Sequence, residues 1–157
     1  MNNLVLASKS KVRKEILQKN GINCLVEPSN VDEEPIKNSL LKEGASPEIV
    51  AKNLAELKAN KVSQKKNEVF VIGADSVIDL NGEIISKPTD RIEALQIMKK
   101  LSGNTHHLIS SVCISKNGTM VWNFTDKAEL KMRELSDEDI NTYLSKISDE
   151  NLFAYNV

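Results

Sequence analysis

Apolar and polar residues alternate in blocks along this chain, and the periodicity of the blocks changes repeatedly between that of a strand and that of a helix. In the N-terminal part, residues 3–7 and 22–27 predict strands, and residues 11–20 predict a helix between them. An acidic loop is predicted at residues 31–35. A long helix is predicted to begin after Ser46, because serine is a favoured N-cap residue and proline follows it. The residues with helical spacing on its apolar face are Val50, Leu54, Leu57 and Val62.

The middle of the chain predicts strands that are joined by tight turns. Residues 69–74 are continuously apolar, which is typical of a strand covered on both faces, and a second strand is predicted at residues 76–80. The Asn-Gly pairs at residues 81–82 and 117–118 each lie between two strand-like runs. Because this dipeptide favours the type I′ turn, both places predict a β-hairpin.

Two further helices are predicted to begin at Asp90 and Ser136, each of which has an acidic residue in the following turn. Helices that alternate with strands and hairpins predict one α/β domain over residues 1–157, with a mixed sheet and flanking helices. Residues 151–157 resemble the beginning of a strand. Either the domain lacks its C-terminal portion, which we expect, or the chain stops naturally at that point.

Composition excludes several classes of function. The chain has 21 basic and 22 acidic side chains, so the strongly basic surface that binds duplex nucleic acid is not expected. Its three Phe, two Tyr and one Trp do not form a row that would stack single-stranded bases. Cys24 and Cys113 are far apart in sequence and are interpreted as small apolar residues in a reducing compartment. No apolar run approaches the ~20 residues that span a bilayer, and we expect a cytoplasmic protein without a membrane segment.

The first candidate site lies between the first strand and the first helix, where Ser8 and Ser10 are followed by basic residues. A helix N-terminus with hydroxyl groups and cations favours a phosphate. The alternative is an ordinary N-cap, in which one of the two serines satisfies the helix end. The residues alone leave these two interpretations about equal.

Charged residues at the ends of predicted elements supply further candidates. Asp75 follows a buried strand and is either a functional carboxylate or the first residue of a turn. Lys87 precedes a proline, and its ammonium group either reaches back toward a site or is solvated. Asp32 and Glu33 could hold Mg²⁺ or could form a solvated acidic loop. Lys58 lies on the alanine-rich helix, where a lysine usually extends from the edge of a packed face.

Six motifs in the same order resemble the Maf family of nucleoside triphosphate pyrophosphatases, along nearly the whole chain. The first resembles the family opening L-A-S-x-S-P-R-R-x-E, and the others resemble its D-E, L-A-x-x-K-A, G-A-D-T-V, N-G-E-I with K-P, and L-S-G-x-T-H motifs. In this sequence the six lie at residues 6–15, 31–33, 54–59, 73–77, 81–88 and 101–106. A single motif of this kind would be weak, but six in the same order are specific.

This resemblance implies a Maf-like or inosine-triphosphatase-like α/β fold with a mixed sheet and a deep cleft. It implies hydrolysis of standard or modified nucleoside triphosphates to monophosphate and pyrophosphate, with a divalent cation, which we expect to be Mg²⁺. By matched position, Asp75 resembles the family's proton acceptor, and Glu33 and Asp75 are the expected metal ligands. The residues expected to bind substrate are Ser8, Val12, Arg13, Glu33, Lys58, Ser76 and Lys87. A catalytically weak nucleotide-binding regulator of cell division is the alternative, and a homodimer is expected from the family alone.

The sequence departs from the family pattern at three places. Lys11 and Val12 replace the Pro-Arg of the first motif, so one arginine that faces substrate is missing and the preferred nucleobase stays open. Ser76 replaces the usual threonine but keeps the hydroxyl group. The sequence ends at Val157, where family members continue through an A-G-x-Y-x-I-Q-like segment.

Overall fold

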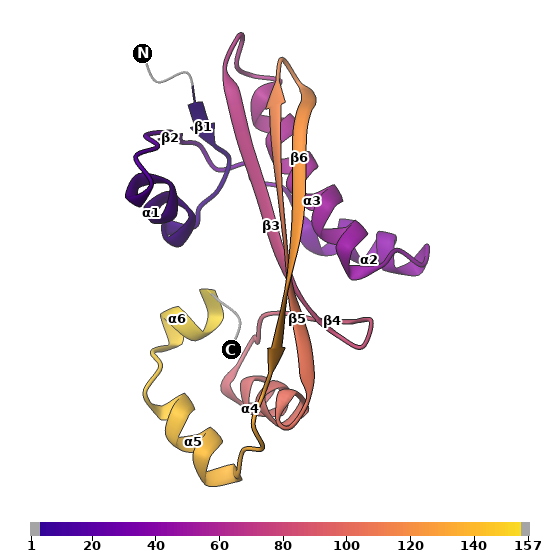
Figure 1. Cartoon of the computed structure of the whole chain (residues 1–157), viewed down its shortest axis with the longest axis vertical. Coiled ribbons are helices and arrows are strands. Elements are labelled where there is room, and N and C mark those ends of the chain that lie inside the picture. The colour runs from indigo at the N-terminus through magenta and orange to yellow at the C-terminus, as the bar shows by residue number, and fades with distance from the viewer. Residues whose placement is uncertain (1–3, 155–157) are drawn as a thin grey trace. The chain divides into compact units, whose positions relative to one another are not determined.

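A computed structural model of the protein describes residues 4–154 and has a mixed α/β architecture (Figure 1). Six strands of the described chain form one sheet in the order β2-β1-β3-β5-β6, with β4 paired to β3 outside this path. β1 runs parallel to both β2 and β3, and β4 runs antiparallel to β3. The elements are β1 Leu4–Leu6, α1 Lys11–Lys19, β2 Leu25–Val26, α2 Glu33–Lys42, α3 Pro47–Ser63, β3 Phe70–Leu80, β4 Glu83–Ile85, α4 Arg91–Leu101, β5 Thr105–Lys116, β6 Thr119–Lys131, α5 Asp137–Ser145 and α6 Asp149–Ala154. The predicted mixed sheet with flanking helices is confirmed.

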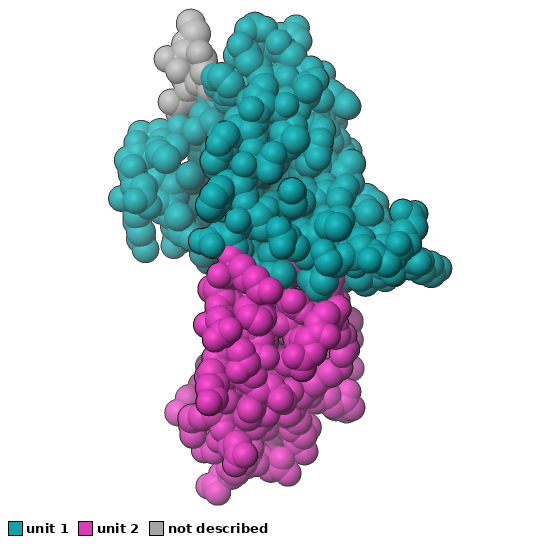
Figure 2. Space-filling model, turned by 45° about the vertical axis from the view of Figure 1, so that its right-hand side comes forward, with its two compact units in different colours: residues 1–76, 109–126 teal, residues 77–108, 127–157 magenta. Residues whose placement is uncertain are grey.

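The chain packs into two compact units, shown in different colours in Figure 2. The first unit contains residues 1–76 and 109–126, and the second contains residues 77–108 and 127–157. The long strands β3, β5 and β6 therefore contribute residues to both units.

No described helix is both long enough and apolar enough to cross a membrane.

In the first unit, α3 packs closely against β3. The Ser46 side chain caps the helix by accepting a hydrogen bond from the Ile49 amide, as predicted. Alanines on α3 allow a close approach to the strand, and Gly73 on β3 has no room for a side chain. A Cβ atom at this glycine would lie against the Ala55 carbonyl oxygen and 2.6 Å from the Ala59 nitrogen. The glycine therefore sets the helix-to-strand distance in this unit.

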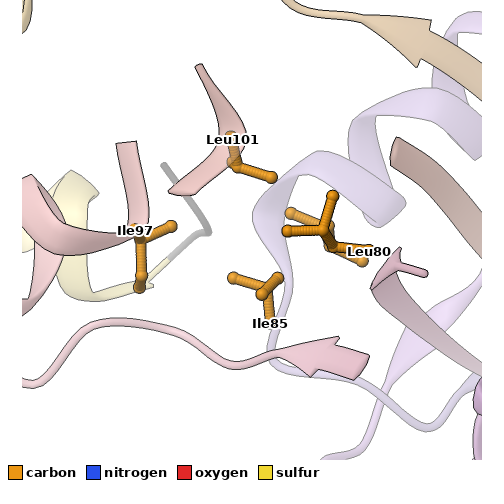
Figure 3. Packing of buried hydrophobic residues seen from close by; sticks show 5 residues of the cluster. Leu80, Ile85, Ile97 and Leu101 are labelled. Carbon is orange, nitrogen blue, oxygen red and sulfur yellow. The ribbon is translucent and has the colours of Figure 1, made fainter. Parts of the chain in front are cut away.

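The second unit has two apolar clusters of its own. In one, β3, β4 and α4 contribute Leu80, Ile85, Ile97 and Leu101, which Figure 3 shows converging from three elements. In the other, Ala94 and Met98 on α4 pack against residues of α5 and α6. Arg91 at the start of α4 donates hydrogen bonds to two backbone carbonyl groups. One is that of Leu144 near the end of α5, and the other is that of Ile147 between α5 and α6. The same guanidinium group pairs with Asp149 at the start of α6.

Three sequence predictions about local structure are wrong. The residues predicted as two strands around Asp75 form one strand, β3, so this carboxylate lies within a strand instead of beginning a turn. Residues 31–35 are only partly a loop, because α2 already begins at Glu33, where acidic residues complement the helix dipole. Residues 151–154 belong to the helix α6, not to a strand, and residues 155–157 of that prediction lie outside the described residues.

The apolar face of α3 also differs from its predicted composition. Val50, Leu54 and Val62 are buried as expected, but Leu57 is 40% exposed. The next residue, Lys58, occupies the buried side of the helix instead. A lysine is tolerated at a buried position only if its charge is paired. Position 58 is therefore unusual, whatever the function of the protein.

Candidate active site

An ion-paired cluster in the first unit joins α3, β3 and the start of α2. The Nζ atom of Lys58 lies 2.8 Å from Oδ1 of Asp75 and 2.8 Å from Oε1 of Glu33. The side chains of Lys58 and Asp75 are each only 8% exposed, whereas that of Glu33 is 48% exposed. One ammonium group therefore binds a deeply buried carboxylate and a second carboxylate that is open to solvent.

Arg13 brings a second cation to the residue before Asp75. Its Nη1 atom donates a hydrogen bond of 2.9 Å to the carbonyl oxygen of Ala74, and it also lies 3.4 Å from Oγ of the buried Ser8. Ser10 acts as the N-cap of α1, because its hydroxyl oxygen accepts from the Arg13 amide. The two interpretations of the serines therefore apply to different residues: Ser10 caps the helix, and Ser8 contacts the arginine. The sequence could not indicate the contact with Ala74, because the acceptor is a backbone carbonyl group, which every residue has.

The electrostatics of the cluster act mainly on Asp75. Burial has the largest effect and raises the pKa of this carboxyl group above its ordinary value. The Lys58 ammonium group opposes the shift, Glu33 adds to it, and Arg13 opposes it. The result is a pKa above 3.8 for a buried carboxyl group that has two cations beside it. A carboxylate with a raised pKa is a suitable proton acceptor near neutral pH.

The structure brings together five of the residues that the sequence singled out: Ser8, Arg13, Glu33, Lys58 and Asp75. Three other residues that were expected to bind substrate are placed elsewhere or differently, and Asp32, the other candidate Mg²⁺ ligand, is the N-cap residue of α2. Ser76 follows Asp75 on β3, and its Oγ lies 3.0 Å from Oγ of Ser110 on β5. Val12 is an exposed apolar residue on α1. Lys87 belongs to the second unit, where it is exposed in the connection between β4 and α4, so its role beside the cluster stays a prediction.

The cluster contains two carboxylates, those of Glu33 and Asp75, which are groups that could bind a hard divalent cation. In the described part of the chain, no group of three or more His, Cys, Asp or Glu residues is placed to hold a metal ion. Glu33 and Asp75 nevertheless converge on one cationic group, the Lys58 ammonium. Mg²⁺ is usually held by one or two carboxylates together with substrate phosphates and waters, so two carboxylate residues are the expected protein contribution.

Comparison with known proteins places this chain among its relatives. Residues 3–152 match the family model described as Maf-like protein. The chain belongs to the Maf family. This member is 62% identical over 154 residues to a nucleoside triphosphate pyrophosphatase of Pelagibacter ubique (strain HTCC1062), an alignment that covers 98% of this chain and 79% of the relative. It is 38% identical over 146 residues to a 7-methyl-GTP pyrophosphatase of Brucella abortus biovar 1 (strain 9-941), covering 93% of this chain and 73% of that protein.

Among solved structures, the chain is similar to the Ham1 protein of Staphylococcus aureus. The TM-score is 0.53 at 15% sequence identity, and the match covers 85% of this chain and 72% of the other. At this level of identity the similarity concerns the fold alone. It agrees with the inosine-triphosphatase-like architecture that the sequence motifs implied.

Proposed function

We propose that this Maf protein is a nucleoside triphosphate pyrophosphatase that cleaves the bond between the α- and β-phosphates. The observation that carries the proposal is the buried pair of Asp75 and Lys58, with Arg13 held beside it. The names of the relatives in Pelagibacter ubique and Brucella abortus support the same reaction class. No observation on the described residues favours the alternative role in cell division.

The proposed reaction is an in-line displacement by water at the α-phosphorus. A bond forms between the water oxygen and phosphorus, and the bond from phosphorus to the bridging oxygen breaks, so that pyrophosphate leaves. Asp75 orients the water and accepts its proton, a task that suits a carboxylate with a raised pKa. Lys58 and Arg13 place positive charge where the phosphate oxygens accumulate negative charge. The Ser8 hydroxyl group adds a neutral hydrogen-bond partner at the N-terminal side of α1.

Glu33 and Asp75 are the residues that would hold Mg²⁺. When bound, the cation would neutralise part of the charge of the triphosphate and of the leaving pyrophosphate. The Lys58 ammonium group already pairs with both carboxylates, so it keeps them close together before the cation binds. Lys87 is proposed to face the phosphates, and Val12 and Ser76 to bind the substrate, on the basis of their matched positions in the family alone.

The test is pyrophosphate release with Mg²⁺ from a panel of nucleoside triphosphates that includes 7-methyl-GTP. Asp75→Asn should lower turnover by about 10²–10⁴-fold, the usual contribution of general-base help, while the protein stays folded. Asp79→Asn is the matched control: Asp79 lies on the same strand, and its side chain accepts from the Gly82 amide in a hairpin, a role that asparagine keeps. Failure of the unmodified protein to release pyrophosphate from any nucleotide would refute the proposed function. Full turnover in Asp75→Asn would refute the role of this residue.

A further inference from the structure

The helix that carries Glu33 is only weakly anchored at its N-terminal end. None of the ten residues of α2 is fully buried, and its contact with α3 involves residues that are only partly buried, such as Ile36 and Leu40. Its N-cap residue, Asp32, makes no capping hydrogen bond with its side chain. The preceding segment contains Asn30, whose φ of 50° lies in the left-handed region. Something outside α2 must therefore hold Glu33 where it reaches Lys58.

Three lysines in the C-terminal half of α3 and just after it hold this segment. Lys61 donates a hydrogen bond of 2.7 Å from Nζ to the carbonyl oxygen of Asn30. Lys66 pairs with the Glu27 side chain at 2.7 Å, farther back in the same segment. Lys58 binds Glu33 itself, as described above. Residues three apart on a helix are neighbours on its surface, so Lys58 and Lys61 contact the segment from adjacent positions.

We infer that Lys61 is a positioning residue for Glu33. It acts through the backbone of Asn30, which lies three residues before the carboxylate, and it fixes where α2 begins relative to α3. The inference rests on the proposed function, because it assigns Lys61 a role in the same reaction. Lys61 is exposed and is not expected to touch the reacting atoms. Loss of its hydrogen bond should leave Glu33 attached to a loosely held helix end, where it samples positions away from Lys58 and the substrate phosphates.

The kinetic test uses Lys61→Met, Lys61→Arg and Lys52→Met. Lys61→Met should lower kcat/KM about three- to tenfold, the effect of one lost hydrogen bond, and Lys61→Arg should restore most of it because arginine also donates to a carbonyl. Lys52 is the matched control, since it is exposed on the same helix and pairs with no acid in the part of the chain that the structure describes. Lys52→Met should leave kcat/KM unchanged. An unchanged kcat/KM in Lys61→Met would overturn the inference.

A double-mutant cycle separates positioning from direct substrate binding. In a Glu33→Gln background, Lys61→Met should change kcat/KM by less than about twofold, because its effect passes through a carboxylate that is already absent. If Lys61 instead bound the triphosphate directly, its loss would cost the same factor in both backgrounds. That result would overturn the inference and leave the proposed pyrophosphatase activity intact.

A second measurement does not depend on activity. Hydrogen–deuterium exchange, followed by mass spectrometry on peptides that cover residues 27–42, should be faster in Lys61→Met than in the unmodified protein. Lys61→Arg should exchange like the unmodified protein, and Lys52→Met should not change these peptides. Equal exchange in all four proteins would overturn the positioning role, even if no nucleotide proved to be a substrate.

Discussion

Replacing Lys58 with methionine removes one cation and leaves two carboxylates without it. Glu33 is half exposed, so water can solvate its charge, but Asp75 is buried and cannot be solvated in the same way. Removing one partner of a buried ion pair typically costs about 3–5 kcal/mol, because an uncompensated charge remains in the interior. Arg13 is close enough to influence Asp75 and should keep the cost within this range. For a chain of this size, the expected fall in melting temperature is about 6–20 °C.

The cost should also depend on pH. Burial already raises the pKa of Asp75 above its ordinary value of 3.8, and Lys58 is the strongest influence that opposes the shift. Because the folded protein binds this proton more tightly than the unfolded chain, stability is lost as pH rises from 3.8 through the folded pKa. Without Lys58 that pKa rises further and the loss continues to higher pH. The destabilisation by Lys58→Met should therefore be larger at pH 8 than at pH 5.

Urea unfolding of the unmodified protein and of Lys58→Met at the two pH values measures both effects. A double variant that also carries Asp75→Asn should recover most of the stability, because no buried charge is left unpaired. Lys99→Met is a control that breaks an exposed ion pair with Asp137, and it should cost only a small fraction of the Lys58 value. A cost for Lys58→Met no larger than this control, or an equal cost at pH 5 and pH 8, would show that the buried-charge reasoning is wrong.

Three further outcomes can be measured. Gly73→Ala should lower the free energy of unfolding by about 1–3 kcal/mol and reduce turnover, because the new methyl group forces α3 away from β3. An unchanged melting temperature together with unchanged turnover would contradict this expectation. The pH profile of kcat/KM should rise through the raised pKa of Asp75, and Glu33→Gln should move this rise to lower pH, because Glu33 adds to the shift. A shift of this rise to higher pH would contradict the influence of Glu33 on the pKa of Asp75. Arg91→Met should lower the free energy of unfolding by about 1–2 kcal/mol without changing turnover per folded molecule, as thermal melts and assays would show.

Local signals in the sequence predicted the parts of the fold that depend on local chemistry. Ser46 and Ser136 cap their helices as expected, and the Asn-Gly pairs turn the chain with positive φ angles at both residues. The errors lie where a distant partner decides the outcome. A carboxylate in an apolar run indicated the end of a strand, but Asp75 stays within β3 because Lys58, 17 residues earlier, pairs with it.

The same reason explains why residue patterns alone could not assemble the site. Helical periodicity placed Leu57 inside and Lys58 at an edge, whereas pairing with Asp75 buries the lysine and exposes the leucine. The grouping of Arg13, Glu33 and Lys58 around one carboxylate was implied only by resemblance to a family. No periodicity in the sequence encodes the approach of α1, α2 and α3 to β3.

The location of Asp75 in the interior of β3 bears on how enzymes of this family can diversify. The backbone of a residue inside a strand is fixed by the residues on both sides of it. Mutations elsewhere therefore change the orientation of its side chain only slightly. Substitutions can then accumulate at exposed positions such as Val12 on α1, while the carboxylate that we propose as proton acceptor keeps its place. Selection for a new substrate would therefore change the exposed residues of such a protein before it changed the buried carboxylate.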